Sequence, residues 1–148
     1  MWLGQEGPTI SCSNATLKGE YAFGVTNYTA SMVVAGIKIF DGNGNFTQRD
    51  YPGDGLQLTP PETDFFPKGR ETGTYAVNSD CTGSMVINLN VPNTPPPHGL
   101  IKIMFVISNG GRHIHEVVSQ FIPPGSTQPV PTQTSADDWK VASKQEQN

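Results

Sequence analysis

Apolar and polar residues alternate with a period of two along most of the chain. In the first such segment, residues 17–28, the side chains of Tyr21, Phe23 and Val25 share one face. This alternation is typical of β-strands with one buried face. The pattern predicts seven strands, and the N-terminal segment is a candidate for an eighth. The seven span residues 17–28, 32–40, 45–51, 71–77, 84–91, 100–108 and 112–121.

Residues that favour turns separate these strands. The run Asp41-Gly42-Asn43-Gly44 predicts a hairpin, because glycine and asparagine tolerate positive φ angles. Residues 79–83 and 109–111 predict two further tight turns. Residues 52–69 show no clear periodicity and predict a long loop, and loops of this length are often lids or binding loops.

The end of the chain has a different pattern. Residues 123–131 are rich in proline and predict an extended segment. The run Ser135-Ala136-Asp137-Asp138 is similar to a capping box at the start of a helix. We therefore expect a short C-terminal helix that carries Trp139 and Val141.

Sequential antiparallel pairing is the simplest topology for strands joined by short turns. A meander must protect its two edges, and closure into a barrel removes them. The predicted fold is all-β, an antiparallel meander closed into a lipocalin-like barrel of roughly eight strands, with a β-sandwich as the main alternative. The barrel domain is expected over residues 1–121, including an irregular arm over 1–11, and a proline-rich tail with the short helix over 122–148.

Composition supports this fold and excludes several classes of partner. The 16 glycines and 13 prolines make up about a fifth of the 148 residues, against roughly 12% in an average protein. Charged residues make up 15%, which argues against a helical bundle. The net charge of −4 gives no basic surface for nucleic acid. No apolar run approaches the roughly 18–20 residues of a membrane-spanning helix, so we expect neither nucleic acid nor membrane as a partner.

The two cysteines, Cys12 and Cys81, lie in polar segments rich in turn formers. Neither belongs to a CxxC pair, which excludes a four-thiolate zinc site. Buried free thiols usually occupy apolar strands, so a disulfide is favoured over two free thiols. A disulfide would imply an oxidising compartment, and we expect a secreted or periplasmic protein, although the first residues show no signal peptide.

The run His113-Ile114-His115-Glu116 is the first candidate for chemistry. On a strand, His113 and His115 share one face and Glu116 lies on the other. Two imidazoles at this spacing can share a metal ion, as in cupin barrels, or serve as acid/base groups, or be two partly exposed histidines of a strand. Glu116 is a candidate general acid or base if its face lines the barrel, and an ordinary solvated side chain otherwise.

Four further residues have two interpretations each. Asp50 and Tyr51 end a strand beside the long loop, where barrels bind ligands, so Asp50 could orient a histidine and Tyr51 could stack on a ligand; the alternative is a plain turn. Lys38 and Lys102 each interrupt an apolar strand. Either is an inward charge that binds an anionic group or a side chain whose ammonium group stays in solvent.

Three segments together resemble a group of small exported bacterial proteins. They span residues 12–23, 40–46 and 73–83 and contain a strand start, a hairpin and the two cysteines. The group is similar to the allene-oxide-cyclase-like barrels, which include dirigent-type proteins and the bacterial pyocyanin demethylase. The resemblance implies an antiparallel barrel with a central cavity, often oligomeric, that takes apolar or aromatic small molecules without a metal or organic cofactor.

Three functions are compatible with these observations. The first is an exported barrel that binds a small hydrophobic or aromatic molecule and isomerises, cyclises or otherwise converts it by cofactor-free acid/base chemistry. The second is a cupin-like metal enzyme that uses His113 and His115, and the third is a non-catalytic interaction or structural module. In the first, the acid/base groups are Glu116, His113 and His115, and the ligand-binding residues are Tyr21, Phe23, Asp50, Tyr51, Phe105 and Gln120.

Overall fold

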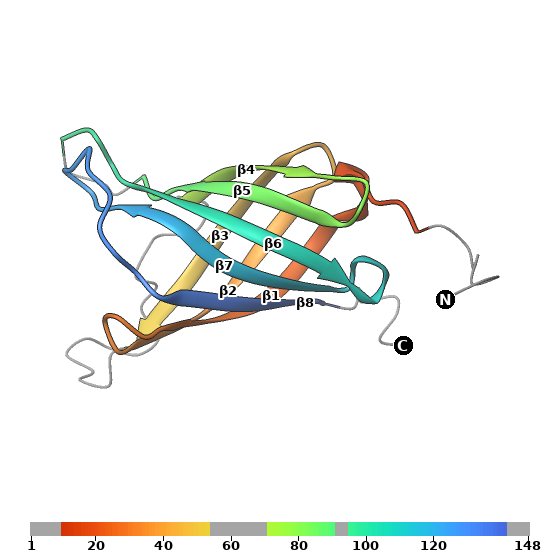
Figure 1. The fold of residues 1–148 in the computed structure, drawn as a ribbon, viewed down its shortest axis with the longest axis horizontal. Coiled ribbons are helices and arrows are strands. Elements are labelled where there is room, and N and C mark those ends of the chain that lie inside the picture. Colours follow the sequence, from red (N-terminus) through yellow and green to blue (C-terminus); the bar gives the residue numbers. More distant parts are fainter. Residues whose placement is uncertain (1–9, 54–70, 91–94, 142–148) are drawn as a thin grey trace, which may run out of the picture.

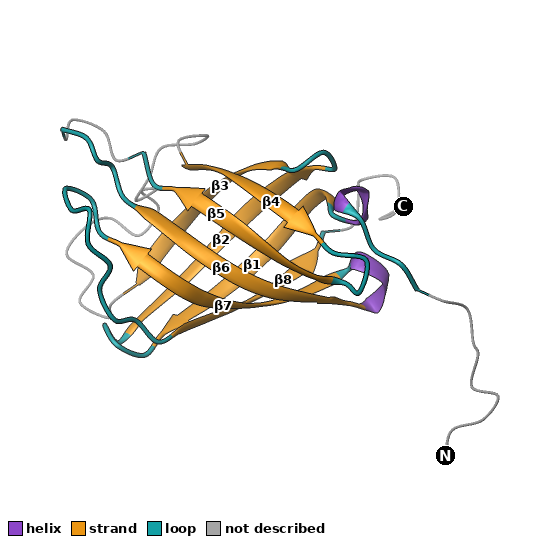
Figure 2. Ribbon diagram, turned by 45° about the horizontal axis from the view of Figure 1, so that its top comes forward, coloured by secondary structure: helices purple, strands orange, loops and turns teal. Residues whose placement is uncertain are grey.

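The computed structural model describes residues 10–53, 71–90 and 95–141. Within them, eight antiparallel strands close into one barrel, in which each strand pairs with its sequence neighbours and the last returns to the first (Figure 1). Two three-residue 3-10 helices, η1 (Asn14–Thr16) and η2 (Asn109–Gly111), lie at one end of the barrel (Figure 2). The strands are β1 (Lys18–Asn27), β2 (Met32–Asp41), β3 (Asn45–Gly53), β4 (Glu71–Val77), β5 (Thr82–Asn88), β6 (Leu100–Ser108), β7 (His113–Ile122) and β8 (Thr134–Lys140).

The strand that closes the barrel comes from the segment predicted to be a helix, so that prediction is wrong. β8 pairs with β1 on one side and with β7 on the other, and its inward residues are Ala136 and Asp138. Without β8, the backbone groups of both neighbours would form open edges. This tertiary gain outweighs the local helix signal. The barrel therefore extends to Lys140 instead of ending at residue 121.

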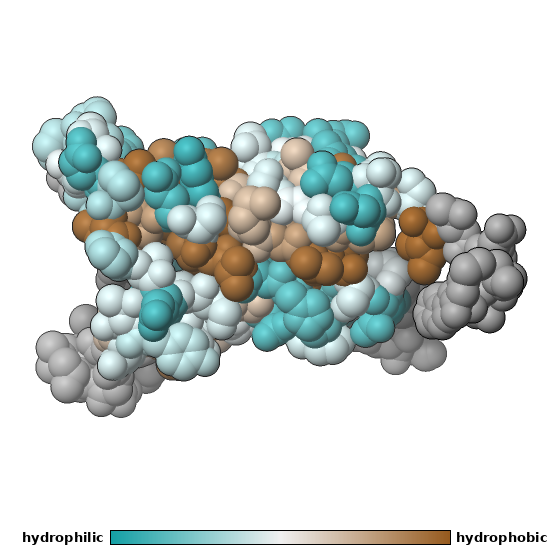
Figure 3. All heavy atoms as spheres, in the orientation of Figure 1, coloured by the Kyte–Doolittle hydropathy of each residue, from teal (hydrophilic) through white to brown (hydrophobic). Residues whose placement is uncertain are grey.

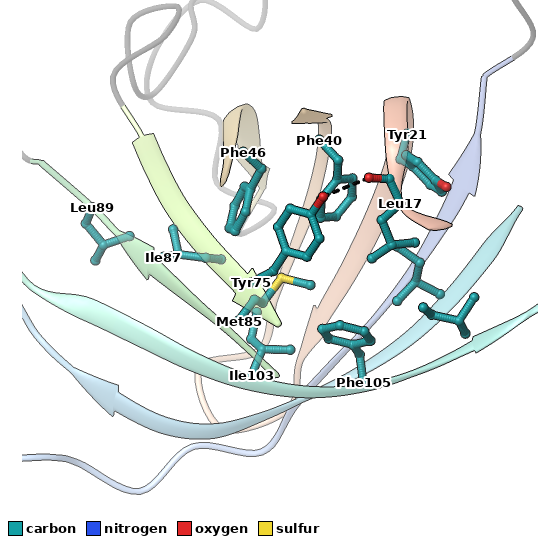
Figure 4. Packing of buried hydrophobic residues seen from close by; sticks show 12 residues of the cluster. Leu17, Tyr21, Phe40, Phe46, Tyr75, Met85, Ile87, Leu89, Ile103 and Phe105 are labelled. Atoms are coloured by element: carbon teal, nitrogen blue, oxygen red, sulfur yellow. Dashed lines mark hydrogen bonds between the residues drawn. The ribbon is translucent and has the colours of Figure 1, made fainter. Parts of the chain in front are cut away.

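One end of the barrel interior is filled by aromatic rings. Tyr21, Phe40, Phe46 and Tyr75 pack with ring centroids 5.0–6.5 Å apart, and two of the pairs are edge-to-face (Figure 4). Edge-to-face contacts are the geometry that aromatic quadrupoles favour. Aliphatic residues and one further ring complete this core, namely Leu17, Met85, Ile87, Leu89, Ile103, Phe105, Ile107 and Ile114.

The N-terminal segment closes the same end, and it forms no strand among the described residues. The hydroxyl of Tyr75 donates to the carbonyl oxygens of Leu17 at 2.8 Å and Asn14 at 3.0 Å. The predicted disulfide is confirmed, and it joins Cys12 to Cys81 with the two Cα atoms 5.0 Å apart. Both η1 and the disulfide therefore hold this segment across the end of the barrel.

The outer wall exposes several apolar side chains among polar ones (Figure 3). Met104 and Val106 of β6 and Val117 of β7 are about half exposed, and Trp139 of β8 is 53% exposed. On β2, the exposed apolar residues Val33, Ala35 and Ile39 alternate with inward positions. The apolar face of β2 therefore lies outside the barrel, and its inner face carries a charged residue.

Candidate functional site in the barrel interior

β2 directs Lys38 into the barrel. In the register of the sheet, Lys38 lies between Tyr21 of β1 and Gln48 of β3, both of which are buried. The lysine is 1% exposed, whereas its neighbour Ile39 is 48% exposed on the outer wall. Burial of an ammonium group is costly unless the charge is paired, so Lys38 requires acidic partners inside the barrel.

Two carboxyl groups meet Lys38 across the interior. Its Nζ atom lies 2.8 Å from Oε1 of Glu116 on β7 and 3.4 Å from Oδ2 of Asp138 on β8. The ring of Phe23 lies 5.0 Å from the same nitrogen and that of Phe46 lies 5.5 Å away. Charge-assisted hydrogen bonds and cation–π contacts are strong where water is excluded. We call Lys38, Glu116 and Asp138 the lysine cluster.

Strands β3 and β4 add three more buried polar side chains: Gln48, Asp50 and Glu71. The Nε2 atom of Gln48 donates to Oε2 of Glu71 at 3.4 Å. Burial raises the pKa of Glu71 to about 9, and the negative charge of Asp50 and a hydrogen bond to it act in the same direction. The Glu71 carboxyl group is therefore protonated at neutral pH.

Protonation in the lysine cluster follows from burial and from its charges. Burial raises the pKa of Asp138 well above its usual range, and Glu116 reinforces this shift while Lys38 opposes it. Burial alone lowers the pKa of Lys38, but the carboxylates of Asp138 and Glu116 outweigh that effect and raise it overall. The cluster therefore combines a charged ammonium group with a carboxyl group that tends to keep its proton.

Three buried side-chain oxygens have no hydrogen-bond partner among the residues that the structure describes. They are Oε1 of Gln48, Oε1 of Glu71 and Oδ1 of Asp138. An unsatisfied buried polar atom costs about 1–3 kcal/mol, so native proteins keep few of them. All three atoms belong to residues within or next to the lysine cluster. This part of the interior therefore offers hydrogen-bonding groups that no described residue uses.

Apolar side chains surround the interior between the cluster and the barrel end opposite η1. That end receives the β1–β2, β5–β6 and β7–β8 connections (Figure 2). The inward residues there are partly exposed, in contrast to the fully packed aromatic end. They include Val25, Val34, Ile101, Val118 and Phe121, of which the last three also pack against the core. Buried polar groups beside partly exposed apolar side chains are typical of ligand sites.

The structure brings some of the predicted site residues together in this interior. Glu116 belongs to the lysine cluster, and Phe23 packs beside it. Phe23 fits because Gly36 faces it, where a Cβ atom would lie 2.5 Å from the phenylalanine ring. Asp50 is buried near Glu71. Phe105 belongs to the packed core.

Tyr21 lies at the packed end, where its hydroxyl donates to the carbonyl oxygen of Gly111. Burial is the main reason that the pKa of Tyr21 rises to about 12. Because Tyr21 is also paired with Lys38 in the sheet, it lies where the packed end meets the lysine cluster.

Other predicted site residues lie outside the barrel. His113 and His115 occupy the outer face of β7, so they cannot act on a molecule held against Glu116. Tyr51 is 43% exposed on the outer wall. Gln120, predicted to bind the ligand, lies opposite the exposed Lys102 because of a β-bulge. The bulge inserts one residue and reverses the alternation beyond it.

Sequence reasoning missed Asp138, Glu71 and Gln48. Asp138 falls in the predicted helix, and residues two apart, such as Ala136 and Asp138, share a face on a strand but not on a helix. Gln48 and Asp50 are two residues apart on one strand, which is a signal of a shared polar face that could have been used. Of the two candidate lysines, Lys38 points inward and Lys102 is solvent-exposed.

Comparisons with known proteins support the architecture. The sequence matches no protein-family model and no curated protein. Among solved structures, that of EF1p2_mFAP2b bound to DFHBI superposes with a TM-score of 0.57 and 11% identity, covering 85% of this chain and 94% of that one. Similarity at this identity shows the fold alone, and it confirms the predicted closed β-barrel. Among the described residues, neither helix is long and apolar enough to cross a membrane.

Proposed function

We propose that the barrel binds a small, largely apolar or aromatic molecule in its interior and holds a polar group of that molecule against the lysine cluster. The observation that carries the proposal is the buried lysine cluster itself, together with the unpartnered oxygens beside it. Apolar residues in place of a buried ion pair are often neutral or stabilising, so such groups are not needed for stability alone. Buried, perturbed ionisable groups are characteristic of functional sites.

The architecture supports the same location. An eight-stranded barrel has an interior that is filled by side chains or holds one small ligand. EF1p2_mFAP2b, which has the same fold, is seen bound to DFHBI. In the present barrel, the aromatic end is packed, so the apolar wall on the other side of the lysine cluster is the place for a ligand.

The cluster also supports cofactor-free proton transfer. Glu116 and Asp138 flank one ammonium group, and burial favours the protonated form of Asp138. In this proposal, one carboxylate removes a proton from the ligand and the other carboxyl group returns a proton elsewhere, as an isomerisation or cyclisation requires. Lys38 stabilises negative charge that develops on a ligand oxygen during the transfer. The disulfide supports an oxidising compartment, such as the periplasm or the cell exterior, as the place of action.

A matched pair of substitutions on β7 tests ligand binding. Val118 is partly buried against the core, whereas its neighbour Val117 is 55% exposed on the outer wall. DFHBI is the first probe, followed by a panel of neutral and anionic aromatic compounds, with fluorescence and the shift in Tm as readouts. We expect Val118→Phe to weaken binding at least tenfold and Val117→Phe to leave it unchanged. Absence of binding by the wild-type protein across the panel, or equal loss in both variants, would refute the proposal.

A further inference from the structure

A second constellation of chemical groups lies on the outer wall, where it cannot serve the interior. Its members are His113 and His115 of β7 and Asp137 of β8, which is directly opposite His115 in the sheet. One carboxylate oxygen of Asp137 lies 3.0 Å from Nε2 of His113 and 2.9 Å from Nδ1 of His115. Each of the three side chains offers one ligand atom, and these three atoms lie within 4.8 Å of one another.

Neighbouring side chains hold these groups in place. Trp139 stacks on His113 with the ring centroids 3.5 Å apart and the planes 16° from parallel. The hydroxyl of Ser108 lies 3.4 Å from Nε2 of His115, the ring nitrogen that does not face Asp137. Partners of this kind orient histidine ligands around metal ions. The side chains of His115 and Asp137 are 54% and 57% exposed, so an ion can reach them from solvent.

We propose that His113, His115 and Asp137 bind a divalent transition-metal ion such as Zn²⁺. Zinc lies about 2.0–2.2 Å from imidazole nitrogen and carboxylate oxygen, and its tetrahedral geometry places the ligand atoms of one ion roughly 3.3–3.6 Å apart. The contacts of Asp137 with the two histidines, at 3.0 and 2.9 Å, are a few tenths of an ångström shorter, so a small separation of these side chains admits the ion between them. Two imidazoles and one carboxylate select zinc or copper over magnesium, which prefers oxygen ligands and retains its water.

Three protein ligands leave one coordination position open. Asp137 also lines a shallow, largely apolar groove of about 640 Å³ on the outer wall, together with Gly24, Ala35, Tyr51 and Trp139. Gly24 and Ala35, which are paired in the sheet, contribute small side chains to its lining, and Tyr51 and Trp139 contribute aromatic ones. A molecule lying in this groove could therefore supply the fourth ligand. This site is on the opposite side of the wall from Glu116, and it does not depend on the proposed interior function.

Zinc binding to the full chain tests the proposal. We expect isothermal titration calorimetry to show one Zn²⁺ per chain and no binding of Mg²⁺. His115→Ala and Asp137→Asn should each weaken Zn²⁺ binding at least tenfold. The third histidine, His98, lies outside the cluster and provides the matched control, so His98→Ala should leave the affinity unchanged. His113→Ala is less informative, because it also removes the stacking partner of Trp139.

A structural readout separates metal ligation from a simple ion pair between histidine and aspartate. On addition of Zn²⁺, the NMR signals of the His113 and His115 rings should shift together, while those of His98 stay in place. Glu116→Gln, on the inner face, should not change the zinc affinity. Binding as tight in His115→Ala as in the wild type, or no stoichiometric binding by the wild type, would show that the three side chains form only an ion pair.

Discussion

The substitution Glu71→Gln is expected to stabilise the protein, by an amount that grows with pH. The pKa of Glu71 is about 9 in the folded chain, mainly because of burial, against an ordinary value of 4.5. Above pH 4.5 the unfolded chain releases this proton, but the folded chain keeps it. Since the folded pKa is the higher one, the stabilising contribution is complete below pH 4.5 and is lost progressively up to about pH 9.

The size of the effect follows from the same two values. Each pH unit above the unfolded pKa removes about 1.4 kcal/mol from the free energy of unfolding while the folded carboxyl stays protonated. At pH 7 the loss amounts to at most about 3.5 kcal/mol, and at pH 5 to less than about 1 kcal/mol. Glutamine has the shape of the protonated acid and can still accept the hydrogen bond from Gln48. The variant should recover most of that loss.

Urea unfolding of the wild type and Glu71→Gln at pH 5, 6, 7 and 8 measures the difference directly. Glu20→Gln makes the same chemical change at an exposed position of β1 and serves as the control. The pKa of Asp138 is also raised, so the pH dependence of the wild type has more than one source. The difference between wild type and Glu71→Gln isolates Glu71. A variant less stable than the wild type at pH 7, or a difference that does not grow with pH, would show that Glu71 is ionised in the folded state.

Two further sets of substitutions test how the disulfide and the lysine cluster contribute to stability. Replacing Cys12 and Cys81 together with serine should lower the free energy of unfolding by about 4 kcal/mol, because the disulfide closes a loop with a sequence separation of 69 residues; an unchanged Tm would contradict this role. Lys38→Met should cost about 3–5 kcal/mol, since it leaves Glu116 and Asp138 without their shared cation. Adding Glu116→Gln and Asp138→Asn should restore much of that stability, and a triple variant as unstable as Lys38→Met would show that the loss is one of packing.

Strand faces could be predicted from the sequence where alternation and turns agree. Tyr21 and Phe23 point inward as one face of β1, and Met85 and Ile87 do so on β5. The hairpin at Asp41 is local too, because one carboxylate oxygen accepts hydrogen bonds from the amides of Asn43 and Asn45. Such features depend on residues a few positions apart, so the sequence contains them in full.

The sequence predictions fail where pairing with another strand decides the conformation. Residues 134–140 carry a local helix signal, and they form β8 because β1 and β7 offer two unpaired edges. The outward position of Gln120 depends on a bulge between Lys102 and Ile103 in the pairing with β6. Both outcomes depend on pairing with another strand, so no periodicity within the segment itself indicates them.

The lysine cluster shows why a functional interior is harder to predict than a core. Lys38 is separated by 78 residues from Glu116 and by 100 from Asp138, so only barrel closure brings the three together. Within β2, burial of the more apolar face would predict that Lys38 points outward. The neighbouring strands place Lys38 inward instead, because Tyr21 and Gln48, the residues paired with it on either side, both point inward. In a barrel of this kind, the sequence signal that best indicates an interior site is therefore a single charged residue that breaks the pattern of its own strand. The residues paired with it on the flanking strands then show that it points inward.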